Sequence, residues 1–268
     1  MIDDRATDDA AEAVFDLRGA GFDLGSRALL RPLDLALAPG RCYGLIGPNG
    51  SGKSTLVKLL ARQLAPTRGE IRFRGRSLAA WEARAFAREL GYLPQFTPPT
   101  DGMLVEELVA LGRYPWHGPL GRFASADRAK VADAMALTQV DLFRGRPVDS
   151  LSGGERQRVW LAMLLAQDAG CLLLDEPTSA LDIAHQIEVL AVIREMTVNR
   201  AMTTLVVLHD VNMAARYCDE IIALGQGALV ARGAPGEIMT PERLEQIYGV
   251  RMGVTCPEGS GRAIGYAL

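Results

Sequence analysis

The stretch that decides the fold reads Gly47-Pro48-Asn49-Gly50-Ser51-Gly52-Lys53-Ser54-Thr55. It fits the spacing G-x-x-x-x-G-K-[ST], follows the apolar run CYGLI at 42–46, and opens a segment with leucines at helical spacing. Glycines in such a loop let backbone N–H groups approach phosphate oxygens, and the N-terminus of the following helix adds a favourable dipole. A glycine-rich turn that binds nothing is the alternative, but a full match in a strand–loop–helix context argues against it. The sequence therefore predicts a nucleoside triphosphate site.

Three side chains of this loop have predicted roles. Lys53 is expected to neutralise charge on the β- and γ-phosphates, and the Ser54 hydroxyl to ligate Mg²⁺. Thr55 is expected to help bind the α-phosphate. A phosphate loop alone indicates only that a nucleoside triphosphate binds, so kinases and GTPases remain open at this point.

Two carboxylates, Asp175 and Glu176, follow directly after the apolar run CLLL at 171–174. At the C-terminal end of a buried parallel strand they would lie beside the phosphate loop, where open α/β sheets bind their ligands. Asp175 is expected to hold Mg²⁺ through its water shell, because magnesium keeps several waters and takes few carboxylates. Glu176 is expected to polarise the attacking water, and a positioned general base typically gives ~10²–10⁴-fold in rate. A merely solvated strand end is the alternative, and the phosphate loop argues against it.

The rest of the chain alternates strand-like and helical patterns. Several strand-like runs are apolar without alternation, as in strands covered on both faces, so the fold class is α/β with a mostly parallel sheet. The strand-like runs lie at 13–17, 41–46, 70–74, 171–174, 204–208 and 220–224. Helical patterns at 103–113 and 126–140 break this rhythm and predict a helical insertion. The predicted organisation is a flexible acidic tail at 1–13, a core at 14–94 and 168–253, a helical subdomain at 95–167, and a C-terminal tail at 254–268.

Composition narrows the class of protein. The 268 residues are 49% hydrophobic and 23% charged, as in an ordinary globular domain. A formal net charge of −3 gives no global attraction for nucleic acid, so no nucleic-acid partner is expected. The sequence has no apolar run of bilayer length, and its acidic start is unlike a signal peptide, which predicts a cytoplasmic chain. Reduced and mostly buried thiols, not a metal site or disulfide framework, are expected at Cys42, Cys171, Cys218 and Cys256.

A second glycine-containing segment, residues 151–157, reads Leu-Ser-Gly-Gly-Glu-Arg-Gln ahead of an apolar-rich helix. Ser152 suits the N-cap and Glu155 the N3 position, which together predict a capping box. Local structure gives no reason for Gly153 and Gly154, since each glycine in a helix costs ~1 kcal/mol relative to alanine. Close approach of an anion to bare backbone amides does give a reason.

Because LSGGERQ is the signature of the ABC ATPase family, the sequence resembles that family. The resemblance covers roughly residues 15–249. It implies a P-loop NTPase (RecA-like) core with a parallel sheet, an antiparallel β edge and an inserted α-helical subdomain. It also implies that ATP and Mg²⁺ are bound and that ATP is hydrolysed.

The resemblance assigns further site residues in chain order. Gln95 is similar to the Q-loop glutamine that contacts Mg²⁺ or the attacking water. Residues 179–182 (Ser-Ala-Leu-Asp) are similar to the D-loop, which crosses the dimer interface and ends here at Asp182. His209 is similar to the switch histidine that contacts the γ-phosphate. Phe22 is similar to the aromatic residue that stacks on adenine, with Arg27 as a companion.

The resemblance also implies partners. Two family subunits pair head to tail, so that each ATP lies between the phosphate loop of one and Ser152–Gly154 of the other. The amides and positive dipole end of the signature helix then face the γ-phosphate. ATP would hold the dimer together and hydrolysis would release it, a ligand-driven population shift. The helical subdomain would pass this motion to an integral membrane permease.

Further short segments of the sequence are similar to ATPases of the importer branch for iron–siderophores and vitamin B12. They are most similar to ferric-hydroxamate (ferrichrome) import ATPases. That branch implies a periplasmic siderophore-binding protein as an indirect partner and a peripheral position on the cytoplasmic face of the inner membrane. A vitamin B12 or heme-type importer is the alternative. These segments lie at 91–95, 102–117, 121–123, 179–186, 208–218 and 247–253.

Roles outside active transport fit the sequence less well, and one aromatic segment allows two interpretations. A soluble ABC ATPase acting on DNA or ribosomes usually carries paired ATPase domains, coiled coils or basic extensions, which the sequence lacks. An inactive structural subunit disagrees with the full set of catalytic residues. The aromatic segment 114–117 (Tyr-Pro-Trp-His) fits either packing inside the helical subdomain or a docking surface for the permease.

Overall fold

The computed structural model describes residues 13–118, 121–179, 181–257 and 261–268. All but the last residue of the predicted acidic tail lies outside these ranges. At the centre is a six-stranded sheet in the order β10-β9-β3-β8-β7-β6, parallel except for the β9–β10 pair at one edge. Its strands are β3 (Cys42–Ile46), β6 (Leu90–Leu93), β7 (Cys171–Leu174), β8 (Thr203–Val207), β9 (Glu220–Gly225) and β10 (Ala228–Gly233).

The central strands are buried on both faces because their side chains alternate between two apolar clusters. In β3, Cys42 and Ile46 pack into the cluster on the side of the helical subdomain, whereas Tyr43 and Leu45 pack into the cluster around α1 (Lys53–Leu60). The same alternation runs through β7 and β8. This explains why these strands read as continuous apolar runs in the sequence.

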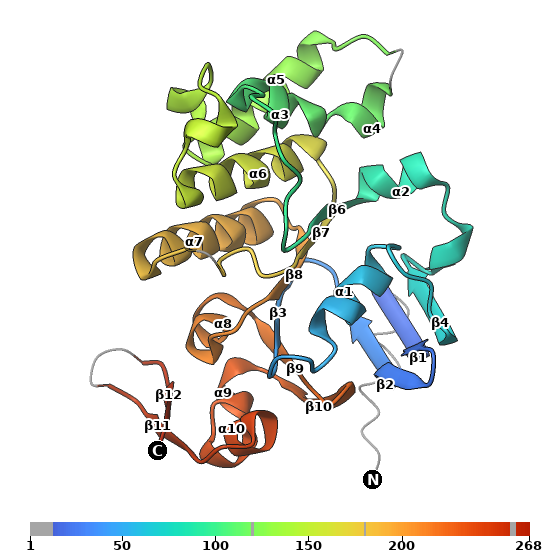
Figure 1. The fold of residues 1–268 in the computed structure, drawn as a ribbon, viewed down its shortest axis with the longest axis vertical. Helices are drawn as coiled ribbons and strands as arrows, with labels where there is room; N and C mark the ends of the chain where they lie inside the picture. Colours follow the sequence, from blue (N-terminus) through green and yellow to red (C-terminus); the bar gives the residue numbers. More distant parts are fainter. Residues whose placement is uncertain (1–12, 119–120, 180, 258–260) are drawn as a thin grey trace.

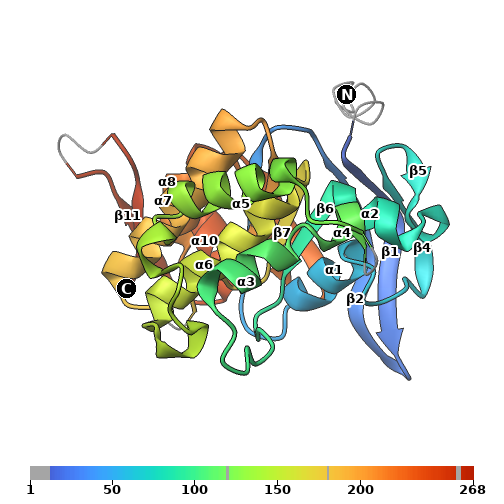
Figure 2. The same ribbon diagram turned by 90° about the horizontal axis from the view of Figure 1, so that it is seen from above.

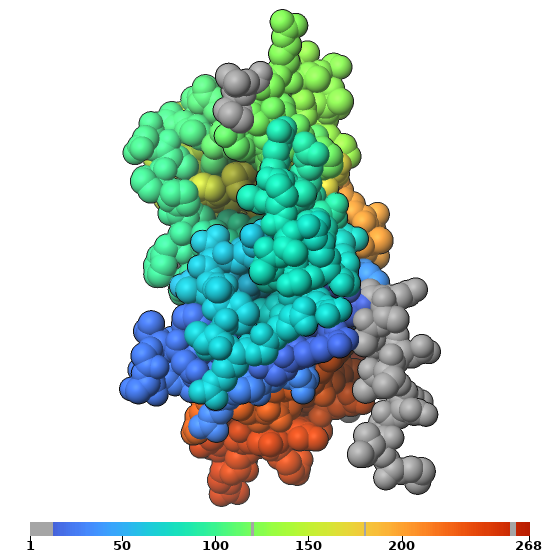
Figure 3. All heavy atoms as spheres, turned by 90° about the vertical axis from the view of Figure 1, so that its right-hand side faces the viewer, coloured from blue at the N-terminus to red at the C-terminus, as the bar shows by residue number. Residues whose placement is uncertain are grey.

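An antiparallel sheet in the order β2-β1-β4-β5 covers the α1 side of the core. Figure 3 shows this sheet and α2 between the helical subdomain above and the C-terminal elements below. The predicted α/β class with an antiparallel β edge is therefore confirmed, although that edge is larger than the two runs that the sequence indicated. Its strands are β1 (Phe15–Leu24), β2 (Arg27–Leu37), β4 (Arg68–Phe73) and β5 (Arg76–Ser77).

Helices form the upper part of the molecule in Figure 1, where α3, α5 and α6 pack against one another. Viewed from above in Figure 2, α3, α5 and α6 lie over the central sheet, with α2 beside β6. The helices are α2 (Ala83–Glu89), α3 (Val105–Leu111), α4 (Tyr114–His117), α5 (Ser125–Leu137), α6 (Gly153–Gln167), α7 (Ile183–Asn199), α8 (Val211–Tyr217), α9 (Pro235–Ile238) and α10 (Pro241–Tyr248). Short 3-10 helices lie at Leu78–Ala80, Asp141–Phe143 and Val148–Ser150.

The C-terminal residues fold back onto the core as a hairpin of β11 (Met252–Thr255) and β12 (Ile264–Ala267). The side chain of Asn212 on α8 holds β12 in place, because its amide donates to Gly265 O at 3.1 Å and its oxygen accepts from Gly265 N at 2.8 Å. Among the helices of the described ranges, none combines the length and apolar character that a bilayer crossing needs.

Candidate nucleotide site

The phosphate loop connects β3 to α1 and depends on glycine at two positions. Gly47 has a φ of 141°, and a methyl group there would lie 2.1 Å from Leu224 O. Gly52 is the N-cap of α1 with a φ of 99°, and no side chain caps the helix there. The first backbone N–H groups of α1 therefore remain available to an anion, as the sequence predicts.

Lys53 places a buried ammonium group under this loop. The residue is 5% exposed, and its Nζ donates to Gly47 O at 2.8 Å and Pro48 O at 3.0 Å. Burial lowers the pKa of Lys53, while the carboxylates of Glu176 and Asp175 oppose that effect. A desolvated cation beside uncapped amides fits a polyphosphate ligand, because an anion would replace the solvation that the ammonium has lost.

Asp175 directly follows β7 and lies next to the start of α1. It is 2% exposed, and its Oδ1 accepts a hydrogen bond from the Ser54 hydroxyl at 3.2 Å. Burial raises the pKa of Asp175, the Ser54 hydrogen bond opposes this, and the charge of Glu176 adds to it. A hydroxyl and a carboxylate side by side are hard oxygen donors, so the residues present fit a hydrated Mg²⁺.

We expect Asp175→Asn to stabilise the nucleotide-free protein while abolishing Mg²⁺-dependent hydrolysis. A carboxyl whose folded-state pKa is raised binds its proton more tightly in the folded state, so its ionisation lowers the free energy of unfolding as pH rises from its unfolded pKa through its folded pKa. Thermal unfolding of both proteins at pH 7 and near pH 4 checks this. The variant should melt higher at pH 7, and the gap should shrink at acid pH. A variant that melts lower at pH 7 would contradict the assigned burial penalty.

Glu176 brings together two residues that lie far away in the sequence. Its Oε2 accepts from Gln95 Nε2 at 2.6 Å and lies 2.8 Å from His209 Nε2. Glu176 also has a φ of 53°, a left-handed conformation that a non-glycine residue rarely adopts and that is found at functional sites. The structure thus places the predicted base, Q-loop glutamine and switch histidine in direct contact.

A polar cavity of about 140 Å³ lies beside this cluster. Glu176 and His209 line one part of it, and Thr178, Ser179 and Gln186 line another. It has room for water next to the carboxylate, which is what a general base needs.

The predicted capping box at the start of α6 is present. Ser152 Oγ accepts from Glu155 N at 3.3 Å, and Glu155 Oε2 accepts from Ser152 N at 2.8 Å. Hydrogen bonding of the Glu155 carboxylate with the backbone N–H of Ser152, and next with the Ser152 side chain, lowers the pKa of Glu155. The expectation that structure alone gives no reason for glycine is wrong at Gly154, which is buried against a residue far away in the sequence. A methyl group at Gly154 would lie 2.4 Å from Cδ2 of His185, so packing alone demands glycine there.

Asp182 lies at the N-terminus of α7, as expected for the end of the D-loop segment, of which Ala180 is outside the described residues. Its Oδ1 accepts from His185 N at 3.0 Å and lies 2.8 Å from His185 Nδ1. These two hydrogen bonds lower the pKa of Asp182. Gln186 donates from Nε2 to Thr178 O and Leu181 O, both at 3.1 Å. Sequence reasoning missed both His185 and Gln186, because only the folded chain shows what they contact.

Phe22 is half-buried on β1, where its cross-strand neighbour is Leu30. A methyl group added at Gly52 would lie 3.3 Å from Cδ1 of Leu30. The pair of strands β1 and β2 therefore borders the phosphate loop. Arg27 is exposed at the start of β2.

In the aromatic segment 114–117, one aromatic side chain is packed against neighbours and another is largely exposed. The guanidinium groups of Arg88 and Arg113 both lie over the ring of Trp116, and the Trp116 Nε1 donates to Gln167 O at 2.6 Å. Tyr114 is instead 51% exposed. Trp116, which is still 36% exposed, therefore packs where α2 of the core meets the helical subdomain.

The structure brings the phosphate loop, Asp175 and the Glu176 cluster into one site, but it leaves Ser152 elsewhere. Figure 1 shows α6 in the helical part of the molecule and α1 below it, and no hydrogen bond or ion pair within the described ranges joins the signature segment to the phosphate loop. Within one chain, the signature segment and the phosphate loop are therefore separate.

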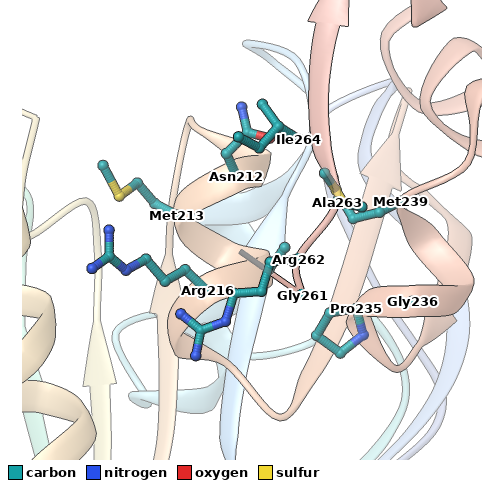
Figure 4. A pocket seen from close by; sticks show the side chains of 11 residues that line it. Asn212, Met213, Arg216, Pro235, Gly236, Met239, Gly261, Arg262, Ala263 and Ile264 are labelled. Atoms are coloured by element: carbon teal, nitrogen blue, oxygen red, sulfur yellow. The ribbon is translucent and has the colours of Figure 1, made fainter. Parts of the chain in front are cut away.

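A second cavity, of about 490 Å³, lies between α8, α9 and the segment before β12. Figure 4 shows the side chains of Arg216 and Arg262 extending toward the same side of it. None of the predicted site residues lines this cavity.

The chain matches a known protein family and individual relatives. The family model described as ABC transporter matches residues 30–179, more than half of the chain. The chain is 44% identical to the achromobactin transport ATP-binding protein of Dickeya dadantii, over 83% of each. It is 44% identical to the hemin import ATP-binding protein of Streptomyces coelicolor, over 86% of this chain and 81% of that one. It is 38% identical to the iron(3+)-hydroxamate import ATP-binding protein of Bacillus subtilis, over 85% of each.

Solved structures share the fold. A chain of an ABC transporter assigned to the metal-chelate type, in an inward-facing conformation, superposes with a TM-score of 0.83 at 25% identity, covering 96% of this chain and 97% of that one. A dimeric bacterial ABC transporter cassette superposes with a TM-score of 0.72 at 24% identity, covering 82% of this chain and 98% of that one. This chain belongs to the ABC transporter family, whose ATP-binding proteins are ATPases that couple hydrolysis to transport.

Proposed function

We propose that this chain hydrolyses ATP to drive an ABC importer that takes up iron–siderophore or heme-type chelates. The observation that carries the catalytic part is the meeting of Gln95 and His209 on Glu176, next to buried Lys53 and Asp175. The names of the relatives, which refer to achromobactin, hemin and iron(3+)-hydroxamate, support the substrate class.

The residues divide the work by their chemistry. The amides of the phosphate loop and the Lys53 ammonium bind and orient the triphosphate. These donors replace the water molecules that would otherwise solvate the phosphate oxygens. Ser54 and Asp175 would hold Mg²⁺, with Gln95 as a further ligand, and the bound ion would supply electrostatic stabilisation of phosphate charge. Glu176 orients the attacking water and accepts its proton, and His209 contacts the γ-phosphate from the end of β8.

The signature segment serves a second copy of the chain. Ser152 and Gly153 are exposed at the N-terminus of α6, away from their own phosphate loop. Backbone amides and a positive helix dipole at a surface are suited to the γ-phosphate held by a partner. ATP then lies between two subunits, and Asp182 faces the same interface. The dimeric cassette that shares this fold supports this arrangement.

An integral membrane permease is the partner that receives the motion, and the helical subdomain is the part that contacts it. We place the subunit on the cytoplasmic face of the inner membrane, held there by the permease. A periplasmic siderophore-binding protein would deliver the chelate to that permease.

For the substrate itself we propose ferric hydroxamate, with heme as the second candidate because a hemin importer ATPase is as similar as the achromobactin one. A strain that lacks this gene, complemented with the wild-type gene or with Glu176→Gln, tests the proposal by uptake of radioactive iron. Ferrichrome, ferric enterobactin and hemin are supplied in turn. We expect wild-type complementation to restore ferrichrome uptake and the variant to fail. If only hemin uptake is restored, the substrate is heme and not ferric hydroxamate. Co-purification with ribosomes instead of a permease would overturn the transport role.

A further inference from the structure

The first turn of α7 contacts both of the segments that the proposed dimer presents to its partner. This turn runs from Asp182 to Gln186. His185 packs on the signature segment, Gln186 holds the loop that follows Glu176, and Asp182 is hydrogen bonded to His185. These contacts lie within one subunit, so they set the relative position of its two partner-facing segments.

The contact between His185 and Gly154 leaves no free space. A methyl group at Gly154 would lie 2.4, 2.8 and 3.1 Å from Cδ2, Cγ and Cβ of His185, and its three nearest neighbours are all atoms of this one side chain. Real Cβ atoms do not approach other atoms that closely, so the ring lies directly on the glycine backbone. Any displacement of the ring toward α6 must move the start of the signature helix with it.

Asp182 prevents the ring from turning away. Its Oδ1 accepts from His185 N at 3.0 Å and from the ring Nδ1 at 2.8 Å, so backbone and ring are held by the same oxygen. Rotation of χ1 at His185 would break the second bond. The ring therefore links Asp182 rigidly to Gly154.

Two further contacts make this turn part of a larger rigid unit. Gln186 Nε2 donates to Thr178 O and Leu181 O, which lie on either side of Ser179 in the loop after the catalytic carboxylate. Arg158 on α6 pairs with Glu188 on α7, so the two helices are tied one turn beyond the glycine contact. The D-loop and the signature segment are thus supported by one helix end.

We infer that His185 is a positioning residue that sets the signature segment of its own subunit at a defined distance from Asp182, so that both reach the partner's nucleotide together. This inference rests on the proposed function, because the signature segment acts on a nucleotide bound by the second copy. His185 itself need not touch ATP. Its effect should therefore appear in hydrolysis and dimer formation, not in the affinity of one monomer for ATP.

A double-mutant cycle between Gly154 and His185 tests the contact. Gly154→Ala should reduce ATP hydrolysis on the order of 100-fold, because the added methyl displaces the ring and the segment. His185→Ala alone should reduce it about tenfold. In the double variant the closest remaining contact would be the 3.1 Å one to Cβ of residue 185, which is still tight, so activity should rise from the Gly154→Ala level toward that of His185→Ala. If Gly154 is required only for approach of phosphate, the double variant stays as inactive as Gly154→Ala, and the inference is overturned.

His185→Asn is the matched control for the link to Asp182. Its amide nitrogen occupies nearly the position of the ring Nδ1, so the hydrogen bond to Asp182 is kept while half of the ring is lost. We expect its kcat to stay within about threefold of the wild type, with an unchanged KM for ATP. A loss equal to that of His185→Ala would show that the bond to Asp182 has no positioning role.

Dimerisation separates a failure of this inference from a failure of the proposed function. In the Glu176→Gln background, ATP should produce a dimer in size-exclusion chromatography, and adding His185→Ala should weaken it while affinity of the monomer for a fluorescent ATP analogue is unchanged. If the Glu176→Gln protein itself stays monomeric with ATP, the in-trans site of the proposed function is wrong. If it dimerises equally with and without His185, only the positioning role is wrong.

Discussion

Glu176→Gln is expected to bind ATP normally and to hydrolyse it at least about 100-fold more slowly, because an amide has the shape of the carboxylate but cannot accept a proton. The structure sharpens this expectation. Gln95 Nε2 and His209 Nε2 both meet the same oxygen, Oε2, at 2.6 and 2.8 Å. The substitution therefore removes the group that accepts the proton, while the amide oxygen can still accept hydrogen bonds from both neighbours and no cavity is opened.

The measurement is phosphate release at saturating Mg²⁺ and ATP, paired with nucleotide affinity and size-exclusion chromatography. Because hydrolysis no longer separates the subunits, the variant should accumulate as an ATP-bound dimer. Glu245→Gln, at a solvent-exposed site on α10, makes the same chemical change away from the site and should leave turnover unchanged. Undiminished turnover in Glu176→Gln would mean that another group is the base.

Ser152→Arg is expected to abolish hydrolysis while leaving ATP binding by the isolated monomer intact. Ser152 is exposed and caps α6, and the described contacts do not join it to its own phosphate loop. A long cation at this position would block the surface that approaches the partner's γ-phosphate and remove the cap. Loss of such preorganised donors typically lowers a rate by ~10²–10³-fold. Ser125→Arg, at the exposed start of α5, is the matched control and should remain active.

A mixing experiment decides whether the site is shared between subunits. Ser152→Arg protein and Lys53→Ala protein are each expected to be inactive alone. In a mixed dimer, the intact phosphate loop of the first faces the intact signature segment of the second, so one complete site is restored and hydrolysis should reappear. If monomeric Ser152→Arg loses its affinity for ATP, or if mixing restores nothing, the site lies within one chain.

Local patterns carried a large part of the prediction. The run CLLL matches β7 at both ends. The predicted runs for β3 and β9 differ from the observed strands by one residue at one end, and the run for β8 by one residue at each end. These strands are buried on both faces, so their apolar character is visible without knowing their neighbours. The capping box at Ser152 was equally visible, because both of its partners lie within one helical turn.

Patterns that depend on distant partners were predicted poorly. β2 was missed, and β1 extends to Leu24 instead of ending at residue 17, because these strands alternate polar and apolar residues and are stabilised by pairing with each other. The helix predicted at 103–113 is shorter, Val105–Leu111. The hairpin of β11 and β12 was not expected, since its place is decided by the contacts of Asn212 with Gly265.

The sequence by itself determined that the chain holds a phosphate loop, a carboxylate pair and a signature segment. Each is a short contiguous motif that can be recognised from its own residue types and spacing. Only the tertiary structure decided that Gln95 and His209 meet on one oxygen of Glu176, that the signature segment lies outside its own nucleotide site, and that Gly154 is packed under His185. Those facts depend on how the strands are ordered in the sheet and how α6 lies against α7. Such arrangements arise from contacts between residues far apart in the chain, which no local pattern encodes.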